Sequence, residues 1–585
     1  MKNRIARSFL ALTLSCVANV AAAQPAADWS ALERSRTNAA KPTTTAITAE
    51  DLRSRVFIFA DDSMRGRVLG DRGNVMGTRY LAEELKRMGV EPAGENGTYF
   101  QLVPIVERAF DESSRVRVGD MSLEAWKDYV MRDQGPGQRS IDGVPTVWGG
   151  VWGDPSRMIP REAAAGKVVV LTGRPSENGS GIQGLPNRQQ VSAYFENAAA
   201  VMVVGVENLP PGSIPAYKQP TGGMRNDRPE PIVSYYYVTA PVARAVFDAD
   251  PAGLAAGTPG RPFSGNAAIK EAPAPAFVQN PAYNVIGIIR GSDPVLRNEY
   301  VAIGAHNDHV GMEPRAAAHD STFIINRLFK LQGADDVDPK LTPADVARVN
   351  SMLADIRRKT NGASARIDSV YNGADDDASG SMSVLEMAEH FVGQRVKPKR
   401  SMLFVWHVGE EAGLFGSEWF TDHPTVPRES IVAAFNMDMV GRGDATDVTG
   451  VTKDGKQIRG SDNYVQLIGS RRLSKELGDL VEKVNTAKSH KMALDYSLDA
   501  DGHPQNIYCR SDHERYARYG IPVVFFTTGG HSEYHQLTDE PQYLNYPHMQ
   551  RVANFVKDVA IETANLDIRP RLDRPKPDPK APCQQ

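Results

Sequence analysis

The stretch YVAIGAHNDH, residues 300–309, decides the class of fold. Its first half is an apolar run without polar alternation, which is typical of a strand covered on both faces of a sheet. The run ends in His306, and Asp308 follows two positions later. Such a histidine can bind a metal ion through one ring nitrogen while a carboxylate holds the other nitrogen. A polar turn without a metal is the alternative interpretation.

Four further apolar runs of strand length lie outward from this stretch, and segments with helical periodicity separate several of them. Because strands alternate with helices, the sequence predicts an α/β fold with a mixed, mostly parallel sheet flanked by helices. These strands are expected at residues 284–289, 401–408, 431–437 and 521–527, and helices at residues 78–88, 342–358, 381–391 and 546–563.

Three adjacent aspartates, residues 375–377, precede one of the expected helices. Adjacent carboxylates repel one another unless a cation or a helix N-terminus compensates, so capping of the helix is one interpretation and metal binding is another. A calcium loop is a further alternative, although residues 369–373 are typical of a turn and not of an incoming helix. Its ligand spacing is matched by Asp375, Asp377, Ser379, Gly380 and Glu386.

Acidic residues and histidines follow three of the other apolar runs. In the pair Glu410 and Glu411, one carboxylate could bind a metal while the other moves a proton. Asp438 interrupts an apolar strand, where a charge is costly unless it is paired or metal-bound. His531 and His535 lie in a Gly-rich loop, and the residues alone do not decide between them. Exposed or hydrogen-bonded polar residues without a catalytic role remain the alternative at each position.

The joint order of these segments resembles the di-zinc exopeptidase family of bacterial leucyl aminopeptidase, aminopeptidase Y and glutamate carboxypeptidase II. The resemblance implies a catalytic domain over residues 49–110 and 280–565. The Gly- and Pro-rich stretch between them, residues 111–279, resembles an inserted, mainly β protease-associated domain. The matching motifs are AHNDHVG, GADDDASG, EEAGLFGS, NMDMVG, SDH at residues 511–513, and YHQLTDE.

The resemblance implies two Zn²⁺ ions per chain. His306 and Asp438 would bind one ion, Glu411 and His535 the other, and Asp376 would bridge both. Three carboxylates and two histidines form a mixed oxygen and nitrogen set that suits zinc.

Three further roles follow from the same resemblance. Glu410 would be the general acid/base for a zinc-activated water, and Asp308 would orient His306. Tyr508 would stabilise the tetrahedral intermediate. An insertion over residues 312–367, much longer than in minimal relatives, could form a lid or a subunit contact.

The expected function is that of a peptide-cleaving exopeptidase, most simply an aminopeptidase, with a carboxypeptidase or dipeptidase as the alternative. A calcium-binding or receptor-like non-catalytic protein is the alternative of another class, and a glutaminyl-cyclase-like transferase shares the expected fold. The sequence contains neither a G-x-S-x-G nor an H-E-x-x-H motif. Its net charge of -4 does not favour nucleic-acid binding. The oligomeric state is left open.

The N-terminal residues 1–23 have the pattern of a secretory signal, with Lys2, Arg4 and Arg7 before an apolar stretch. A flexible leader is expected over residues 24–48. We therefore expect a periplasmic or secreted protein without stable membrane insertion after signal cleavage.

The cysteines and the C-terminal tail give weaker expectations. Cys16 lies inside the signal, and Thr13 stands where a lipoprotein signal usually has leucine, so a lipid anchor is not expected. An exported protein could join Cys509 to Cys583, but their spacing does not establish a bridge. The tail, residues 566–585, is rich in proline and charge and is predicted to be disordered.

Overall fold

The computed structural model describes residues 34–585, except 132–140, 176–181, 187–189, 192–193, 211, 226–232, 267–268, 274–279, 360–365 and 582. The predicted signal, Cys16 and the first part of the leader lie outside the described residues. Among the helices of the described part, none is both long and apolar enough to cross a membrane.

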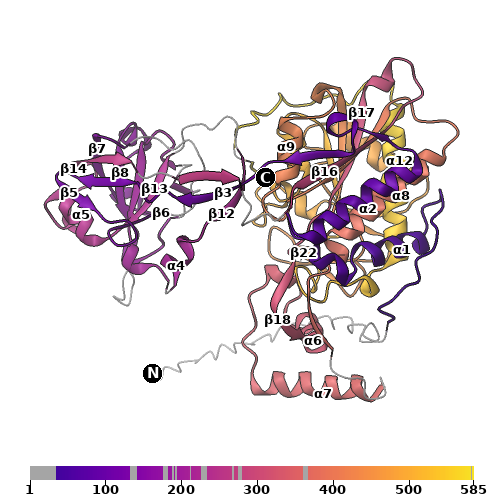
Figure 1. The fold of residues 1–585 in the computed structure, drawn as a ribbon, viewed down its shortest axis with the longest axis horizontal. Coiled ribbons are helices and arrows are strands. Elements are labelled where there is room, and N and C mark those ends of the chain that lie inside the picture. The colour runs from indigo at the N-terminus through magenta and orange to yellow at the C-terminus, as the bar shows by residue number, and fades with distance from the viewer. Residues whose placement is uncertain are drawn as a thin grey trace, which may run out of the picture.

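A nine-stranded sheet forms the centre of the larger part of the molecule (Figure 1). Its order is β1-β16-β20-β17-β21-β26-β24-β25, and β2 also pairs with β16. The inner strands β20, β17, β21 and β26 are parallel, whereas β16 and β24 run antiparallel to their inner neighbours, which confirms the mixed α/β sheet. The bounds are β1 Glu91–Pro92, β2 Phe100–Val103, β16 Ala282–Ile289, β17 Tyr300–His306, β20 Ser401–His407, β21 Ile431–Met437, β24 Tyr464–Ile468, β25 Ala493–Asp495 and β26 Val523–Thr527.

Helices cover both faces of this sheet. The larger core packs α1, α2, α8, α10 and α12 against one face, and the smaller core on the other face includes Phe420 of α9 and Tyr516 of α11. Helix α2 starts at Arg72, earlier than predicted, and ends before Gly89, whose φ of 76° suits a glycine. The bounds are α1 Ala49–Phe59, α2 Arg72–Met88, α8 Gly380–Gly393, α9 Phe415–Asp422, α10 Lys475–Ala487, α11 His513–Ala517 and α12 Tyr546–Asn565.

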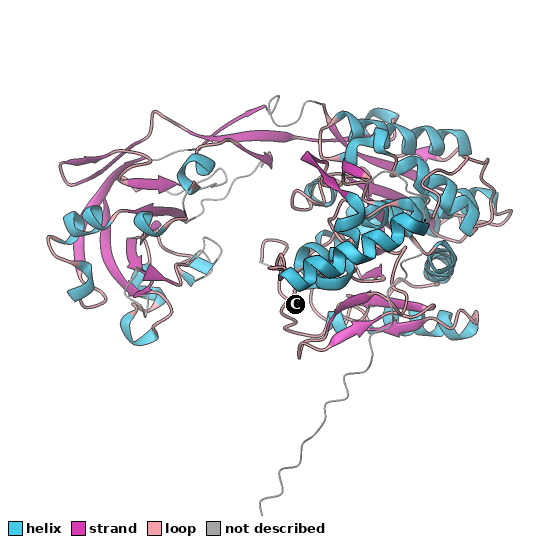
Figure 2. Ribbon diagram, turned by 90° about the horizontal axis from the view of Figure 1, so that it is seen from below, coloured by secondary structure: helices cyan, strands magenta, loops and turns pink. Residues whose placement is uncertain are grey.

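The chain between β2 and β16 forms a separate β-rich part, which Figures 1 and 2 show beside the helix-covered sheet. Its eight-stranded sheet has the order β5-β4-β14-β7-β8-β11-β13-β6, and a three-stranded sheet, β12-β3-β15, leads to it. Its assignment as a protease-associated domain stays a prediction. The bounds are β3 Ile105–Phe110, β4 Arg115–Val118, β5 Met121–Leu123, β6 Tyr129–Met131, β7 Val144–Val151, β8 Val168–Thr172, β9 Arg174–Pro175, β10 Ile182–Gln183, β11 Ala200–Val204, α4 Ser213–Tyr217, β12 Thr221–Met224, β13 Ser234–Val238, α5 Ala240–Phe247, β14 Pro259–Asn266 and β15 Ile269–Pro273.

The predicted insertion after β17 is a small unit that lies below the nine-stranded sheet in Figure 1. It consists of β18 (Met312–Ala318), α6 (His319–Phe329), α7 (Pro343–Lys359) and β19 (Ile367–Val370), with β18 and β19 paired antiparallel. Helix α7 confirms the helix predicted from Thr342. Two further strands, β22 (Val448–Val451) and β23 (Gln457–Arg459), pair antiparallel in a hairpin.

The C-terminal tail corrects the prediction of disorder. Cys583 forms a disulfide with Cys509, and the Gln585 side chain accepts a hydrogen bond from the Tyr508 main chain at 2.9 Å. Further upstream, the Asp573 main chain donates to the Leu473 carbonyl at 3.0 Å. Composition alone indicated disorder because it does not reveal such individual anchors.

Candidate metal centre

The five predicted metal ligands lie together at the carboxyl edge of the parallel strands. His306 is the last residue of β17, and Asp438 directly follows β21. Glu411 follows β20, and His535 lies in the loop after β26. Asp376 lies in a single π-helical turn, Ala374–Ser379, that leads into α8. Parallel strands place their carboxyl ends at one edge, so residues far apart in the sequence meet there.

His306 faces two carboxylates with one nitrogen. Its Nε2 lies 3.0 Å from Asp376 Oδ1 and 3.7 Å from Asp438 Oδ1. Its Nδ1 lies 3.1 Å from the Asp308 carbonyl oxygen and 3.7 Å from the Asp308 carboxylate. The carbonyl is therefore the nearer orienting group, and it favours the tautomer that leaves Nε2 free to bind a metal.

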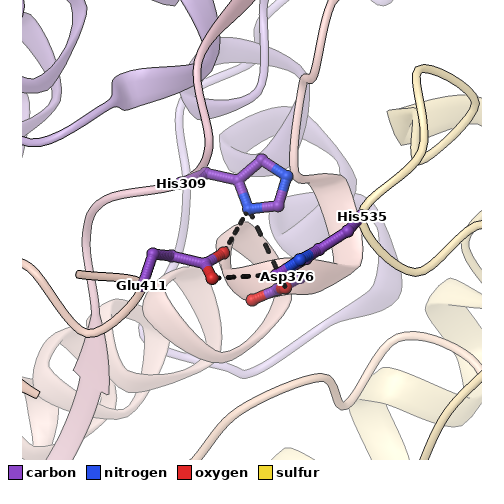
Figure 3. A group of neighbouring side chains, drawn as sticks. All are labelled: His309, Asp376, Glu411 and His535. Atoms are coloured by element: carbon purple, nitrogen blue, oxygen red, sulfur yellow. Dashed lines mark hydrogen bonds and ion pairs between the residues drawn. The ribbon is translucent and has the colours of Figure 1, made fainter. Parts of the chain in front are cut away.

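The other oxygen of Asp376 faces a second cluster, drawn in Figure 3. His535 Nε2 lies 2.9 Å from Asp376 Oδ2 and 2.9 Å from Glu411 Oε2. His309 Nδ1 lies 2.8 Å from Glu411 Oε1 and 3.8 Å from Asp376 Oδ2. Because its two oxygens face different histidines, Asp376 has the placement that a ligand between two metals requires.

The chemistry of these side chains fits zinc. Nitrogen and oxygen donors converge in two groups, and His306 Nε2, which faces Asp376 and Asp438, is buried without a hydrogen bond. A neutral imidazole nitrogen that faces carboxylates needs a proton or a cation between them. Imidazole and carboxylate are both common zinc ligands.

Asp375 and Asp377 flank Asp376 but are engaged with the main chain. Asp375 Oδ1 accepts from the Gly441 main chain at 2.6 Å. Asp377 accepts from His306 at 3.1 Å and from Gly380 at 2.8 Å. Asp375 and Asp377 thus both hold main-chain amides, whereas the two oxygens of Asp376 face His306 and His535.

The calcium-loop alternative is wrong in this structure. Glu386, which would be its last ligand, lies fully buried in α8 and forms an ion pair with Arg55. Burial raises the pKa of Glu386 to about 8, although the charge of Arg55 acts in the opposite direction. A carboxylate committed to that arginine is not a ligand of a neighbouring loop.

Glu410 lies on the wall of a cavity beside this cluster. Its main chain donates to the Asp308 carboxylate at 3.1 Å, which ties the loop after β20 to the loop after β17. Burial raises the pKa of the Glu410 carboxyl well above its usual value, and the charges of Asp438 and Glu411 act in the same direction. The placement suits a group that exchanges a proton with a bound substrate.

The structure does not bring Tyr508 to this cavity. Its ring packs beneath the Arg472 guanidinium, 4.7 Å from the ring centre, and against His513. Tyr534 lines the cavity instead, and its ring stacks on His535 with the ring centres 4.1 Å apart. The position of Tyr508, three residues before the SDH motif, did not reveal the direction in which its side chain points.

The structure also separates the two histidines of the Gly-rich loop. His531 is buried and faces Asp375 Oδ2 at 3.2 Å and Glu533 Oε2 at 3.4 Å, away from Asp376. Burial opposes its protonation, but these carboxylates together raise the pKa of His531 to about 9. His535 is the histidine that faces Asp376.

The cavity beside the cluster has a volume of about 100 Å³. Its apolar wall is formed mainly by Met439, Leu498, Ile507 and Phe525. Its polar wall includes Gln332 and Asp335 of the insertion together with Arg510 and Tyr534. The cavity therefore adjoins both the carboxylates and the inserted segment.

Sequence reasoning missed four residues at this site. His309 belongs to the quoted motif AHNDHVG, and its position three residues after His306 was the available signal. Ser511 donates to Asp438 Oδ2 at 2.7 Å, and it begins the SDH motif. Tyr534 and Asp335 had no such signal, because only the folded loops place them on the cavity wall.

Part of the catalytic domain resembles known peptidases in sequence. Residues 359–560 match Peptidase family M28. Leucine aminopeptidase 1 of Coccidioides posadasii is 28% identical over 205 residues, which are 34% of this chain and 48% of the relative. The enzyme of the same name from Ajellomyces capsulatus is 27% identical over 205 residues, with the same two shares. The chain spans about half the length of the curated relatives it matches.

Two solved structures align over most of this chain at low identity. An aminopeptidase from Aneurinibacillus sp. strain AM-1 is 15% identical with a TM-score of 0.42, covering 90% of this chain and 95% of its own. A zinc aminopeptidase from Bacillus subtilis is 13% identical with a TM-score of 0.40, covering 89% and 96%.

The matched segment contains four of the five predicted ligands, and His306 joins them in space. These residues define a domain of the zinc metallopeptidase class. The match of residues 359–560 to Peptidase family M28 supports the resemblance to zinc exopeptidases drawn from the motifs.

Proposed function

We propose that this protein is an exported di-zinc aminopeptidase that removes N-terminal residues from peptides. The observation that carries the proposal is the placement of Asp376, whose two oxygens face His306 on one side and His535 on the other. One ion would be held by His306 and Asp438, the other by Glu411 and His535, with Asp376 between them. His309, whose Nδ1 lies 2.8 Å from Glu411 Oε1, would help to hold the ion that Glu411 and His535 bind.

Two zinc ions at this position would polarise the scissile carbonyl and make a shared water more acidic. Glu410 would accept the proton of that water at its carboxylate and deliver it to the leaving amine. Ser511 would keep Asp438 in place through its 2.7 Å hydrogen bond.

The charges on the cavity wall favour a free amine over a free carboxylate in the substrate. Recognition of a C-terminal carboxylate needs an available cation. Among the residues that line this cavity, Arg510 is the cationic side chain, and Asp335 already pairs with it at 3.2 Å. This supports an aminopeptidase over the carboxypeptidase alternative.

The substrate class is tested with aminoacyl-chromogenic substrates, their N-acetylated forms and peptides with a free C-terminus. We expect hydrolysis of the free-amine substrates, loss of activity with phenanthroline, and recovery on addition of zinc. Equal or faster cleavage of N-blocked peptides from the C-terminus would instead establish the carboxypeptidase. No hydrolysis by the zinc-loaded protein would favour a non-catalytic, receptor-like role.

The assignment of the proton carrier is tested by Glu410→Gln. We expect this variant to retain the zinc content of the wild type and to lose about 10²- to 10⁴-fold in kcat. Zinc is measured by elemental analysis on the same sample as the kinetics. Turnover at the wild-type rate would show that another group moves the proton.

The bridging role is tested by Asp376→Ala. We expect loss of bound zinc together with loss of activity, because both groups of ligands share this carboxylate. An unchanged zinc content would contradict bridging, even if the activity were lost.

A further inference from the structure

The insertion after β17 packs against the loop that carries His535. Its main chain meets the loop at Tyr534, where Ala334 donates to the Tyr534 carbonyl at 3.0 Å. Gly333 makes this approach possible, since a Cβ atom there would lie 2.4 Å from that carbonyl oxygen. Gly333 also has a φ of 56°, so a side chain would be strained as well as crowded. The close contact is therefore made by the main chains of both segments.

An ion pair fixes the loop just before His535. Arg327 of α6 places its Nε 2.9 Å from Glu533 Oε1, and Glu533 is fully buried. The second Glu533 oxygen lies 2.8 Å from Arg442 Nη2 in the catalytic domain. A buried carboxylate is costly unless it is paired. Through its two ion pairs, Glu533 therefore links the insertion to the catalytic domain.

Polar contacts also hold the loop just after His535. Asn326 Nδ2 lies 3.4 Å from both Gln536 Oε1 and Thr538 Oγ1. Further along, Arg366 of the insertion is ion-paired with Glu540. The inserted segment thus contacts the loop on both sides of the histidine.

His535 needs such support because its main chain is strained. Its φ is 52°, in the left-handed region that a residue with a side chain seldom occupies. Conformations of this kind persist where the surroundings determine them. Its ring must nonetheless face both Asp376 and Glu411 at 2.9 Å. A loop free to relax would move the ring away from both carboxylates.

We infer that the insertion over residues 312–367 is the support of the His535 loop, and that Arg327 is a positioning residue for metal binding by His535 and Glu411. The inference rests on the proposed di-zinc function. It gives the insertion a role inside the chain, in place of the lid or subunit contact that the sequence left open. It also predicts an effect on one ion only, because no contact described above joins the insertion to Asp438 or His306.

The test is a zinc titration of the metal-free protein by calorimetry. Arg327→Met keeps an aliphatic side chain and removes the guanidinium, which pairs with Glu533 and lies over the Phe323 ring. We expect affinity for one of the two ions to fall about 10- to 100-fold, as is usual when a group behind a metal ligand is lost. Arg327→Lys should recover part of that affinity, and Arg358→Met on the exposed face of α7 should bind zinc like the wild type.

Two reference variants identify the affected ion. The zinc affinities of Arg327→Met should change at the same ion as those of His535→Ala, and at a different ion from those of Asp438→Ala. The melting temperature of each metal-free variant separates misfolding from loss of metal affinity. If Arg327→Met does not fold, Asn326→Ala perturbs the other side of the loop, and a smaller loss of about 3- to 10-fold at the same ion is expected.

The outcomes separate the two proposals. Wild-type protein that binds fewer than two zinc ions would overturn the di-zinc function itself. Wild-type protein with two ions, and a folded Arg327→Met with unchanged affinity for both, would overturn only the role of the insertion. Equal weakening of both ions would also contradict it, because that result indicates a general structural effect.

Discussion

At the scale of single residues, the role predicted from the sequence and the placement seen in the structure differ most clearly for two tyrosines. Tyr508 and Tyr534 are both tyrosines near the proposed centre, but only Tyr534 lines the cavity. Burial raises the pKa of Tyr508 to about 12, so its phenol stays protonated, yet the ring packs on Arg472. A hydroxyl acts on a substrate only within hydrogen-bond reach, so position in the sequence is a weak guide to this role.

We therefore predict opposite results for two conservative variants. Tyr534→Phe should lower kcat/KM about 10-fold or more, as the loss of one hydrogen bond to a transition state does. Tyr508→Phe should leave kcat/KM within about twofold. Steady-state kinetics on a chromogenic substrate compare both with the wild type. A large loss for Tyr508→Phe alone would restore the expectation from the sequence.

A second residue-scale prediction concerns His309, whose Nδ1 lies 2.8 Å from Glu411. His309→Ala should weaken binding of the ion near Glu411 by about 10- to 100-fold, whether the ring binds the ion or orients the glutamate. Competition with a chelator of known affinity measures the change. His390, whose Nδ1 donates to the Thr45 carbonyl far along the chain, offers a matched control as His390→Ala. Unchanged binding would leave the predicted five residues as the full ligand set.

At the scale of elements, the apolar strands were predictable and the loops between them were not. The run over 431–437 coincides with β21, because a strand buried on both faces requires an unbroken apolar sequence. The loop after β26 contains two histidines of equal appearance, and only the fold places His535 rather than His531 against Asp376. Polar loop residues satisfy several partners equally well, so their direction depends on contacts remote in sequence.

Helix α11 carries an element-scale prediction about acid stability. His513 is buried against Phe525, and burial lowers the pKa of His513 to about 3. Its unfolded pKa is about 6.5, so its neutral form contributes fully above that pH. The contribution is lost as the pH falls from about 6.5 towards 3. His513→Phe should make the fall in unfolding free energy shallower by about 1.4 kcal/mol per pH unit in that window.

Urea unfolding between pH 7 and pH 4 measures this difference for the wild type and His513→Phe. His423 is a suitable control because it is an exposed histidine at the end of α9. His423→Phe should keep the wild-type slope. Parallel curves for the wild type and His513→Phe would show that His513 does not take up the proton during acid unfolding.

For the whole molecule, the C-terminal tail joins the proposed active site to the end of the chain. The Cys509–Cys583 disulfide spans 74 positions, and Gln585 contacts the Tyr508 main chain next to it. Ile507 and Arg510, on either side, line the cavity. The tail therefore holds one wall of the cavity, which its proline-rich composition gave no reason to expect.

Cys583→Ser should consequently affect both stability and substrate binding. Loss of a bridge over this length should lower the unfolding free energy by about 2–5 kcal/mol, since the unfolded chain gains freedom. KM should rise more than kcat falls, because the tail supports the wall near Ile507 and makes no contact with Glu410 among the interactions described. Wild-type protein treated with dithiothreitol should reproduce both effects, whereas the variant should not respond to it. A variant with wild-type stability and KM would show that the last residues are not a support of the cavity.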